Sequence, residues 1–564
     1  MKTNTIAVNL NDRKLRKYGK SDEAEIIGEF YNYKTPEPTL KTIQHIQKKI
    51  DCPEDLVRHL QSLTGFYSLV IRDKNKIFAV VDITRSIPLF YGQGYGKFFL
   101  SDNAEWVRDQ VGDLEMDSLA KEEFLLTGYV TGRDTLYPNV KQLQAGEYLI
   151  AEETDIGVSI QHQRYYRFLH KEPSLLDEAE LSNKLENATK NAIRRLIEYA
   201  NGRQIVLPLS GGYDSRLIAL LLKHFDYKNV LCFTYGVLGN KEAEYSRRVA
   251  KSLGFAWTFV EYSNVKWATE WSSLEAQEYR EMAANHTSLP HIQDWLAIKT
   301  LVARKDIHLD AIVAPGHSGD FVAGSHIPNF VFSKKTHSQD DLLQALIKDN
   351  YSNVPQAGMA ICKEFGLESR LLDRINLPFD GTDVGLADLY ETWDWQERQA
   401  KYIVNSVRVY DQFKLDWWLP LWDAEFVKFW EGVPLALRKE RIWFKNWITE
   451  QYLSVSAHDE ENQVKNNASD TSILYGLAKR LVKRLPESTL TLIKKMRRNK
   501  IYNSHLLAFG GLINPDDYIT YTNKNYNLIG MYSVLFIKGK WGSIQAHSSD
   551  KYDNQKPTKS IVKP

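Results

Sequence analysis

The chain has 564 residues, of which 43% are hydrophobic and 25% charged, and its formal net charge is +1 at pH 7. This length predicts two or three domains, and the composition is typical of a soluble globular protein. A net charge so close to zero provides no general attraction to nucleic acid, and we expect no nucleic-acid partner.

The cysteines and the first residues indicate the compartment. Cys52, Cys232 and Cys362 are far apart and form no CxxC pair or zinc spacing, which argues against a disulfide framework. The first twenty residues lack the apolar core of a secretory signal. No apolar run reaches the roughly 18 residues needed to cross a bilayer. We therefore expect a cytoplasmic protein.

The first domain, residues 1–165, is predicted to be mostly β. Short β-branched or aromatic runs, separated by turn residues, predict strands at 67–73, 76–82, 97–101 and 146–152. Two helical patterns interrupt these strands, near 39–49 and 118–126.

A second domain, residues 175–450, is predicted to alternate strands and helices. A helical pattern over 175–200 leads into strands at 204–210, 229–236 and 310–316, with helices at 216–225, 241–254 and 290–304. This order predicts an α/β fold with a doubly wound parallel sheet, in which ligands bind at the carboxyl ends of the strands.

The remaining residues, 451–564, are predicted to form a helical, basic extension. Residues 455–472 are polar and are expected to form a flexible loop. Residues 473–500 are basic and amphipathic, with two interpretations: a helix that contacts a membrane surface, or a solvated helix packed on its own domain.

A glycine-containing loop follows the first strand of the second domain. Its glycines expose backbone N–H groups, and the helix that follows adds the positive end of its dipole, which together predict an anion cradle. Asp214 offers a hard oxygen ligand for Mg²⁺. The candidate binding residues of this loop are Leu209, Ser210, Gly211, Gly212, Asp214 and Ser215.

A second loop of the same kind follows the third strand, over residues 314–324. It combines Gly316 with Asp320, as the first loop combines its glycines with Asp214. Because the two loops follow neighbouring strands, Asp214 and Asp320 are predicted to share Mg²⁺ with a triphosphate.

These blocks resemble the asparagine synthetase family, with its relatives β-lactam synthetase, carbapenam synthetase and the lasso-peptide cyclases. The first loop is similar to the family's pyrophosphate loop, and Gly316 and Asp320 match its second loop. The resemblance implies an ATP-pyrophosphatase domain of the adenine nucleotide α-hydrolase-like type, using ATP and Mg²⁺. Further matches, in the same order, are Leu419-Pro420-Leu421-Trp422-Asp423, Val433-Pro434 and Lys445, whose charge would neutralise the phosphates and the tetrahedral centre.

The first domain resembles the family's N-terminal-nucleophile (Ntn) glutaminase domain, an αββα fold. The matching segments are 28–33, 63–68, 82–92 and Ser101-Asp102, where the family binds the glutamine amino group. Such a glutaminase needs cysteine as its mature first residue and an oxyanion-stabilising asparagine. This sequence starts with Met1-Lys2 and has Ile27 at the asparagine position, so we expect no glutamine hydrolysis.

Two features of the second domain allow alternative interpretations. His317 occupies the position at which the family places a residue that helps to deprotonate the amine, and is either that base or a phosphate or structural contact. The tryptophans between 393 and 447 are expected to be mainly core, with the alternative that a few stack on a sugar.

The resulting expectation is a carbon–nitrogen ligase that works through an acyl-adenylate and releases AMP and pyrophosphate. Its carboxylate would belong to a small molecule or a glycan, such as a sugar of a surface polysaccharide, and its nucleophile would be ammonia or an amine. Two alternatives are an intramolecular cyclase of the β-lactam or lasso-peptide type and a nucleotide-binding pseudo-enzyme that acts as a regulator. The sequence leaves the oligomeric state open.

Overall fold

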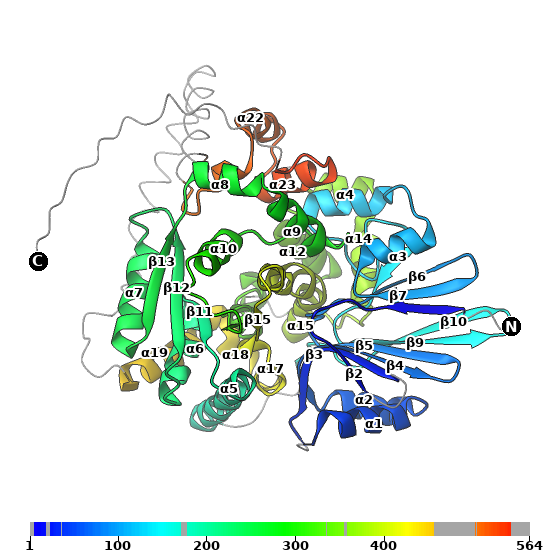
Figure 1. Ribbon diagram of the computed structural model, residues 1–564, viewed down its shortest axis with the longest axis horizontal. Helices are drawn as coiled ribbons and strands as arrows, with labels where there is room; N and C mark the ends of the chain where they lie inside the picture. Colours follow the sequence, from blue (N-terminus) through cyan, green and yellow to red (C-terminus); the bar gives the residue numbers. More distant parts are fainter. Residues whose placement is uncertain are drawn as a thin grey trace, which may run out of the picture.

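A computed structural model describes residues 5–18, 23–34, 37–170, 177–333, 336–354, 358–455, 502 and 505–542. Two α/β domains lie side by side, with the first domain on the right of Figure 1 and the second on the left. The last described residues, 505–542, lie across the top of both domains in this view.

The first domain stacks two sheets between two pairs of helices. One sheet has the order β1-β7-β6-β8 and the other β10-β9-β5-β4-β3-β2. Helix α1 packs on the second sheet and α3 on the first, which confirms the αββα arrangement (Figure 1). The elements are β1 (Ile6–Asn9), β2 (Leu15–Tyr18), β3 (Ala24–Asn32), α1 (Thr39–Lys49), α2 (Pro53–Leu60), β4 (Leu63–Asp73), β5 (Lys76–Val81), β6 (Phe90–Gly94), β7 (Lys97–Ser101), α3 (Ala104–Val111), α4 (Ser118–Thr127), β8 (Val140–Gln142), β9 (Glu147–Thr154) and β10 (Gly157–Arg164).

The sequence patterns missed six of these ten strands. Strand β3 shows the reason, because its charged residues interrupt the apolar run that identifies a buried strand. Glu25 forms an ion pair with Arg72 at 3.0 Å, and Glu29 forms one with Arg16 at 3.0 Å. Neighbouring strands provide these partners, and a pattern read along one strand cannot detect them.

The second domain contains a five-stranded parallel sheet with the order β13-β12-β11-β14-β15. The strand order reverses at β11, which has β12 on one side and β14 on the other, so the predicted doubly wound sheet is confirmed. Such a reversal opens a crevice at the carboxyl ends of the strands. The elements of the sheet layer are α5 (Glu178–Ala200), β11 (Ile205–Pro208), α6 (Tyr213–His224), β12 (Val230–Gly236), α7 (Lys241–Leu253), β13 (Ala256–Glu261), α8 (Asn264–Trp271), α9 (Leu274–Ala284), α10 (Trp295–Ala303), β14 (Ile312–Val313), α11 (Gly319–Val322) and β15 (Asp416–Trp417).

A largely helical region follows α11, and β15 is the one named strand within the part of it that the structure describes. Its helices are α12 (Gln339–Asn350), α13 (Gly358–Glu364), α14 (Leu367–Ile375), α15 (Asp383–Asp394), α16 (Arg408–Gln412), α17 (Ala424–Glu431), α18 (Leu435–Arg438) and α19 (Ile442–Val455). A π-helix over Trp395–Ile403 directly continues α15. Such segments widen a helix by one residue per turn and are frequent at functional sites.

The tryptophans of this region are core residues. Trp393, Trp395, Trp418, Trp422 and Trp430 are each at most 2% exposed. The core interpretation of these side chains is therefore confirmed, and none of the described tryptophans lines the cavity presented below.

The motif at 419–423 joins the two domains. Asp423 caps α17 by accepting a hydrogen bond from the Glu425 N–H, and it accepts two more from Arg195 at 2.6 and 2.7 Å. Thr64 of β4 donates a further hydrogen bond to Asp423 at 3.1 Å. A family motif of the second domain thus holds the first domain in place.

Residues 505–542 pack against both domains. Helix α22 (Pro515–Asn523) and helix α23 (Leu528–Ile537) lie in this segment, and α23 contacts α4. Phe536 stacks on Phe124 with ring centroids 5.6 Å apart, while Trp541 lies 5.2 Å from Trp271. The segments predicted as a flexible loop (455–472) and a basic helix (473–500) lie, from residue 456 on, outside the described residues. No helix of the described ranges has the length and apolarity that a membrane crossing requires.

Candidate functional site

A cavity of about 420 Å³ opens at the carboxyl ends of β11, β12 and β14, which is within the size range of small-molecule sites. Most of the residues predicted from the two loops line it: Leu209, Ser210, Gly212, Asp214, Ser215, Gly316, His317 and Asp320. Two predicted residues lie beside it. Gly211 is in the same loop, near Tyr245, and Lys445 on α19 is close enough to Asp214 to act on its charge.

The first loop leads into a helix whose first N–H groups are available. Gly212 occupies the N-cap of α6 and has no side chain to accept from them. Within the loop, the Gly212 N–H donates to the Ser210 hydroxyl at 3.1 Å and the Ser210 N–H to the Ser215 hydroxyl at 3.2 Å. An uncapped helix start next to two hydroxyls is a ready site for an anion.

The two loops approach each other so closely that glycine is required. A Cβ on Gly316 would lie 2.7 Å from the Ser215 nitrogen, and one on Gly319 would lie 2.7 Å from a carboxylate oxygen of Asp214. A larger residue at either position would push the loops apart. The glycines therefore set the distance between Asp214 and the loop that carries Asp320.

The two carboxylates have opposite pKa shifts. Burial, together with the charge of Asp320, raises the pKa of Asp214 to about 6, although Arg441 partly opposes this with contacts of 3.0 and 3.1 Å. Burial also disfavours the charged form of Asp320, but His326 and Arg441 outweigh it and lower the pKa of Asp320 to about 2.

His326 is the centre of a second charged group. Its Nε2 lies 3.5 Å from Asp320 and its Nδ1 contacts Asp394. Burial lowers the pKa of His326, but the two carboxylates outweigh it and raise this pKa to about 10. His326 is therefore an imidazolium at neutral pH, and it holds Asp320 in its ionised form.

The residues at this site fit a magnesium ion bound with a triphosphate. Two carboxylates face one small volume, and the negative charge of one makes ionisation of the other unfavourable, a cost that a divalent cation relieves. Arg441 and His326 contact these carboxylates in the structure. A metal at Asp214 would take the place of the Arg441 contact.

His317 is an uncharged base at neutral pH. Its Nδ1 lies 3.2 Å from the Ser406 hydroxyl, and its ring centroid is 6.4 Å from that of His291. Burial, with a smaller effect of His291, lowers the pKa of His317 to about 4. In the tautomer whose Nδ1–H donates to Ser406, Nε2 carries the lone pair that accepts a proton.

Several lining residues were missed in the sequence. The π-helix contributes Arg398, Gln399 and Ile403, and residues 291–294, predicted to be helical, precede α10 instead and contribute His291, Gln293 and Asp294. This expected start of the helix at residue 290 is wrong, because α10 begins at Trp295. No motif identifies these residues, since they come from segments far from both loops in sequence.

In the first domain, two positions of the resemblance have structural partners. Ile27 is fully buried in β3 opposite Ser68 and Leu15, so its side chain offers no hydrogen bond. The carboxylate of Asp102 accepts hydrogen bonds from the backbone N–H groups of Asn11 and Asp12, at 3.1 and 2.8 Å. Backbone N–H groups of this chain thus bind the carboxylate that, by the resemblance, would bind the amino group of glutamine.

Comparison with known families gives the class of protein. Residues 25–166 match the glutamine amidotransferase domain family, and residues 184–453 match the asparagine synthase family. The chain thus carries an amidotransferase-type domain followed by an asparagine synthase domain. The chain belongs to the asparagine synthetase family.

Two solved structures show remote similarity. One is glutamine phosphoribosylpyrophosphate amidotransferase from B. subtilis in complex with ADP and GMP, with 11% identity, a TM-score of 0.17, and coverage of 54% of this chain and 63% of that chain. The other is described as the allosteric regulatory enzyme of purine biosynthesis, with 12% identity, a TM-score of 0.18, and coverage of 66% and 76%. This chain thus spans less than two thirds of the first structure's length. Among curated proteins, none matches the chain.

Proposed function

We propose that the cavity adenylates a substrate carboxylate with ATP and then joins the acyl group to ammonia or an amine. The observation that carries this proposal is the convergence of both loops, with Asp214 and Asp320, at the start of α6. The uncapped N-terminus of α6 and the two serine hydroxyls suit the departing pyrophosphate.

In the first step, a carboxylate oxygen attacks the α-phosphorus of ATP, the bond from that phosphorus to the β-phosphate oxygen breaks, and pyrophosphate leaves. Asp214 and Asp320 are proposed to hold Mg²⁺, which when bound neutralises the charge on the phosphates. Lys445, half-buried on α19 near Asp214, adds a positive charge on the same side. Positioning and charge neutralisation supply most of the rate in such a reaction.

In the second step, an amine nitrogen attacks the acyl carbon, a proton moves to a base, and AMP leaves with its oxygen. His317 is proposed as this base, because burial keeps it neutral far below pH 7 and because it lines the same cavity. If His317 instead contacts a phosphate, loss of its side chain should impair adenylation.

The nitrogen is proposed to come from free ammonia or an amine and not from glutamine. Ile27 replaces a donor with an apolar side chain, and Asp102 is bound to the chain's own backbone. Release of glutamate from glutamine by the purified protein would contradict this proposal.

The carboxylate is proposed to belong to a polar small molecule or a carboxylated sugar. Polar groups such as Gln293, Gln399 and Arg398 line the cavity, and they suit a substrate with several hydrogen-bonding groups. The stacking argument for a sugar no longer applies, since the tryptophans are in the core. An intramolecular cyclase would use the same two steps on a single substrate that carries both groups.

ATP–pyrophosphate exchange tests the proposal. Radiolabelled pyrophosphate should enter ATP only when the matching carboxylate is present, and Asp214→Ala should abolish this exchange. Carboxylated sugars, amino acids and amine-bearing acids form the panel, and cyclisation of the last group would identify a cyclase. ATP binding that is unchanged in Asp214→Ala and Asp320→Ala, with no exchange for any acid, would instead indicate a nucleotide-binding regulator.

A further inference from the structure

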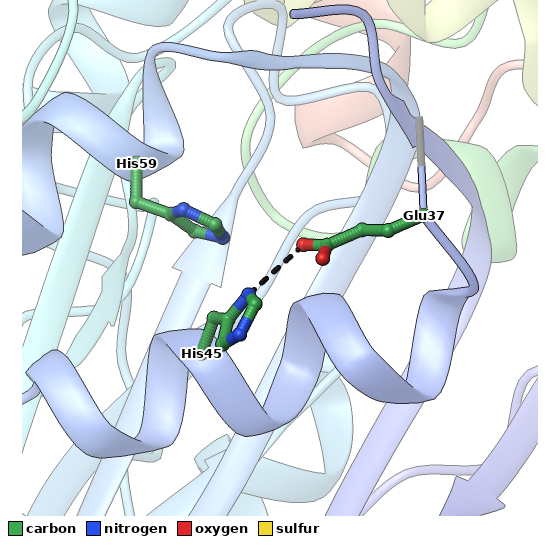
Figure 2. A group of neighbouring side chains, drawn as sticks. All are labelled: Glu37, His45 and His59. Carbon is green, nitrogen blue, oxygen red and sulfur yellow. Dashed lines mark hydrogen bonds and ion pairs between the residues drawn. The ribbon is translucent and has the colours of Figure 1, made fainter. Parts of the chain in front are cut away.

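A cluster of three metal-ligating side chains lies in the outer helical layer of the first domain. Glu37 precedes α1, His45 lies in the middle of α1, and His59 lies in the last turn of α2. One ligand atom from each lies within 4.8 Å of the other two, and this is the one such cluster found among the described residues. Figure 2 shows the three side chains pointing toward one another.

Ordinary hydrogen bonding accounts for only part of this arrangement. His45 Nδ1 and a Glu37 oxygen are 3.1 Å apart, and the Thr42 hydroxyl donates to the same oxygen at 3.2 Å. His59 Nε2, in contrast, is buried and makes no hydrogen bond. A buried polar atom without a partner destabilises the fold, and a bound ligand would remove this cost.

Solvent exposure also separates this group from a surface ion pair. The Glu37 side chain is only 7% exposed, whereas the His45 side chain is 39% exposed. The carboxylate is thus withdrawn from water, and one edge of the cluster remains open to solvent. An ion could enter from that edge, and a water molecule could complete its coordination there.

The donor set favours zinc over the other common ions. Two imidazoles and one carboxylate, with an open fourth position, are a known ligand set for Zn²⁺, while Mg²⁺ and Ca²⁺ prefer oxygen ligands. Ligand atoms around a tetrahedral Zn²⁺ lie about 3.4 Å apart, given metal–ligand distances of about 2.0–2.2 Å. From 4.8 Å or less, small side-chain rotations suffice to reach this spacing.

We propose that Glu37, His45 and His59 form a zinc site that fastens α1 to α2 and to the residue preceding α1. Neither helix contributes to the lining of the cavity at the carboxyl ends of β11, β12 and β14. The role of the site is therefore to stabilise the outer layer that covers the six-stranded sheet, without part in the ligase reaction.

Zinc titration of the full chain, with any histidine tag removed, tests the proposal. Metal-free protein is titrated with Zn²⁺ alone in competition with a chromogenic chelator, and Co²⁺ is added separately to observe its visible absorption. We expect one tight equivalent, a tetrahedral-type Co²⁺ spectrum, and a Zn²⁺-dependent rise in the midpoint of thermal unfolding. His59→Ala and Glu37→Gln should each weaken binding by at least about tenfold and abolish that rise.

His162→Ala is the matched control, because His162 on β10 also has a buried Nε2 without a hydrogen bond but is not part of a ligand cluster. This variant should bind Zn²⁺ like the parent protein. Glu37→Gln keeps the size of the side chain, so it tests the ligand even if His59→Ala disturbs the packing of α2. Zinc binding that is absent in the parent, or equally strong in Glu37→Gln and His162→Ala, would overturn the proposal.

Discussion

The raised pKa of Asp214 makes a quantitative prediction about nucleotide binding. Only the ionised carboxylate can hold Mg²⁺, and with a pKa of about 6 the ionised fraction falls about tenfold between pH 7 and pH 5. The affinity for an unreactive Mg²⁺–ATP analogue should fall by the same factor over this range. Isothermal titration calorimetry at several pH values, in excess Mg²⁺, measures it.

Arg441→Met is the perturbation that isolates the effect. Arg441 contacts both oxygens of Asp214 and opposes the rise in its pKa, so its removal should raise that pKa further. With an increase of about one unit, typical of a lost charge partner, only about half of the Asp214 carboxylates would be ionised at pH 7. The ratio of the variant's affinity to the parent's affinity should therefore be about twofold lower at pH 7 than at pH 8.5.

The ratio between the two proteins is the informative quantity. Titration of the phosphates of ATP is common to both and cancels, and any lost or gained contact of Arg441 with phosphate changes the ratio equally at every pH. A ratio that stays constant between pH 7 and pH 8.5, or a parent affinity that stays constant down to pH 5, would refute the assignment of Asp214.

Three further variants test other parts of the site. His317→Asn should retain ATP–pyrophosphate exchange but lose amide formation by about 100-fold or more, as measured by product release, whereas loss of exchange would indicate a phosphate contact. Arg438→Met should lower the free energy of unfolding by about 3–5 kcal/mol in thermal or denaturant melts, because Glu391, 2.6 Å away, is left charged and fully buried. The double variant that also carries Glu391→Gln should recover part of this loss of stability. If it recovers none, the ion pair is not the cause of the loss. His326→Asn should lower the midpoint of thermal unfolding most below pH 6.5. The raised pKa of His326 contributes stability at such pH values, and this stability is lost as the pH rises toward about 10. A difference in melting midpoint between variant and parent that stays constant across this range would contradict the charge assigned to His326.

The fold was predictable where the chain carries its own signals. Residues 205–208 are an apolar run that ends in glycines and continues into a helix, so the strand, the turn and the helix of the first loop are all local features. Strand β3 is different, because Glu25 and Glu29 depend on arginines of neighbouring strands, and the period of the pattern is lost. Ion pairs with the neighbouring strands therefore stabilise a strand that the pattern along its own sequence does not predict.

The candidate site divides in the same way. The two loops could be predicted because glycine and aspartate occur there at short spacing. Arg441 and His326 could not, since each approaches the loops only through the folded arrangement of α11, α15 and the turn before α19. Nothing in their local sequence signals these contacts, yet they set the charge of both carboxylates.

The position of residues 505–542 affects the order in which the molecule can form during synthesis. Leu507 lines the cavity, the Leu506 carbonyl accepts a hydrogen bond from the Val237 N–H, and Trp267 donates its ring N–H to the Leu507 carbonyl at 2.9 Å. The sheet that supports the two loops is complete by Trp417, long before this segment leaves the ribosome. A nascent chain can therefore fold its first domain and this sheet while one wall of the cavity is still missing, and the cavity is complete only after residues 505–542 have been synthesised and have packed.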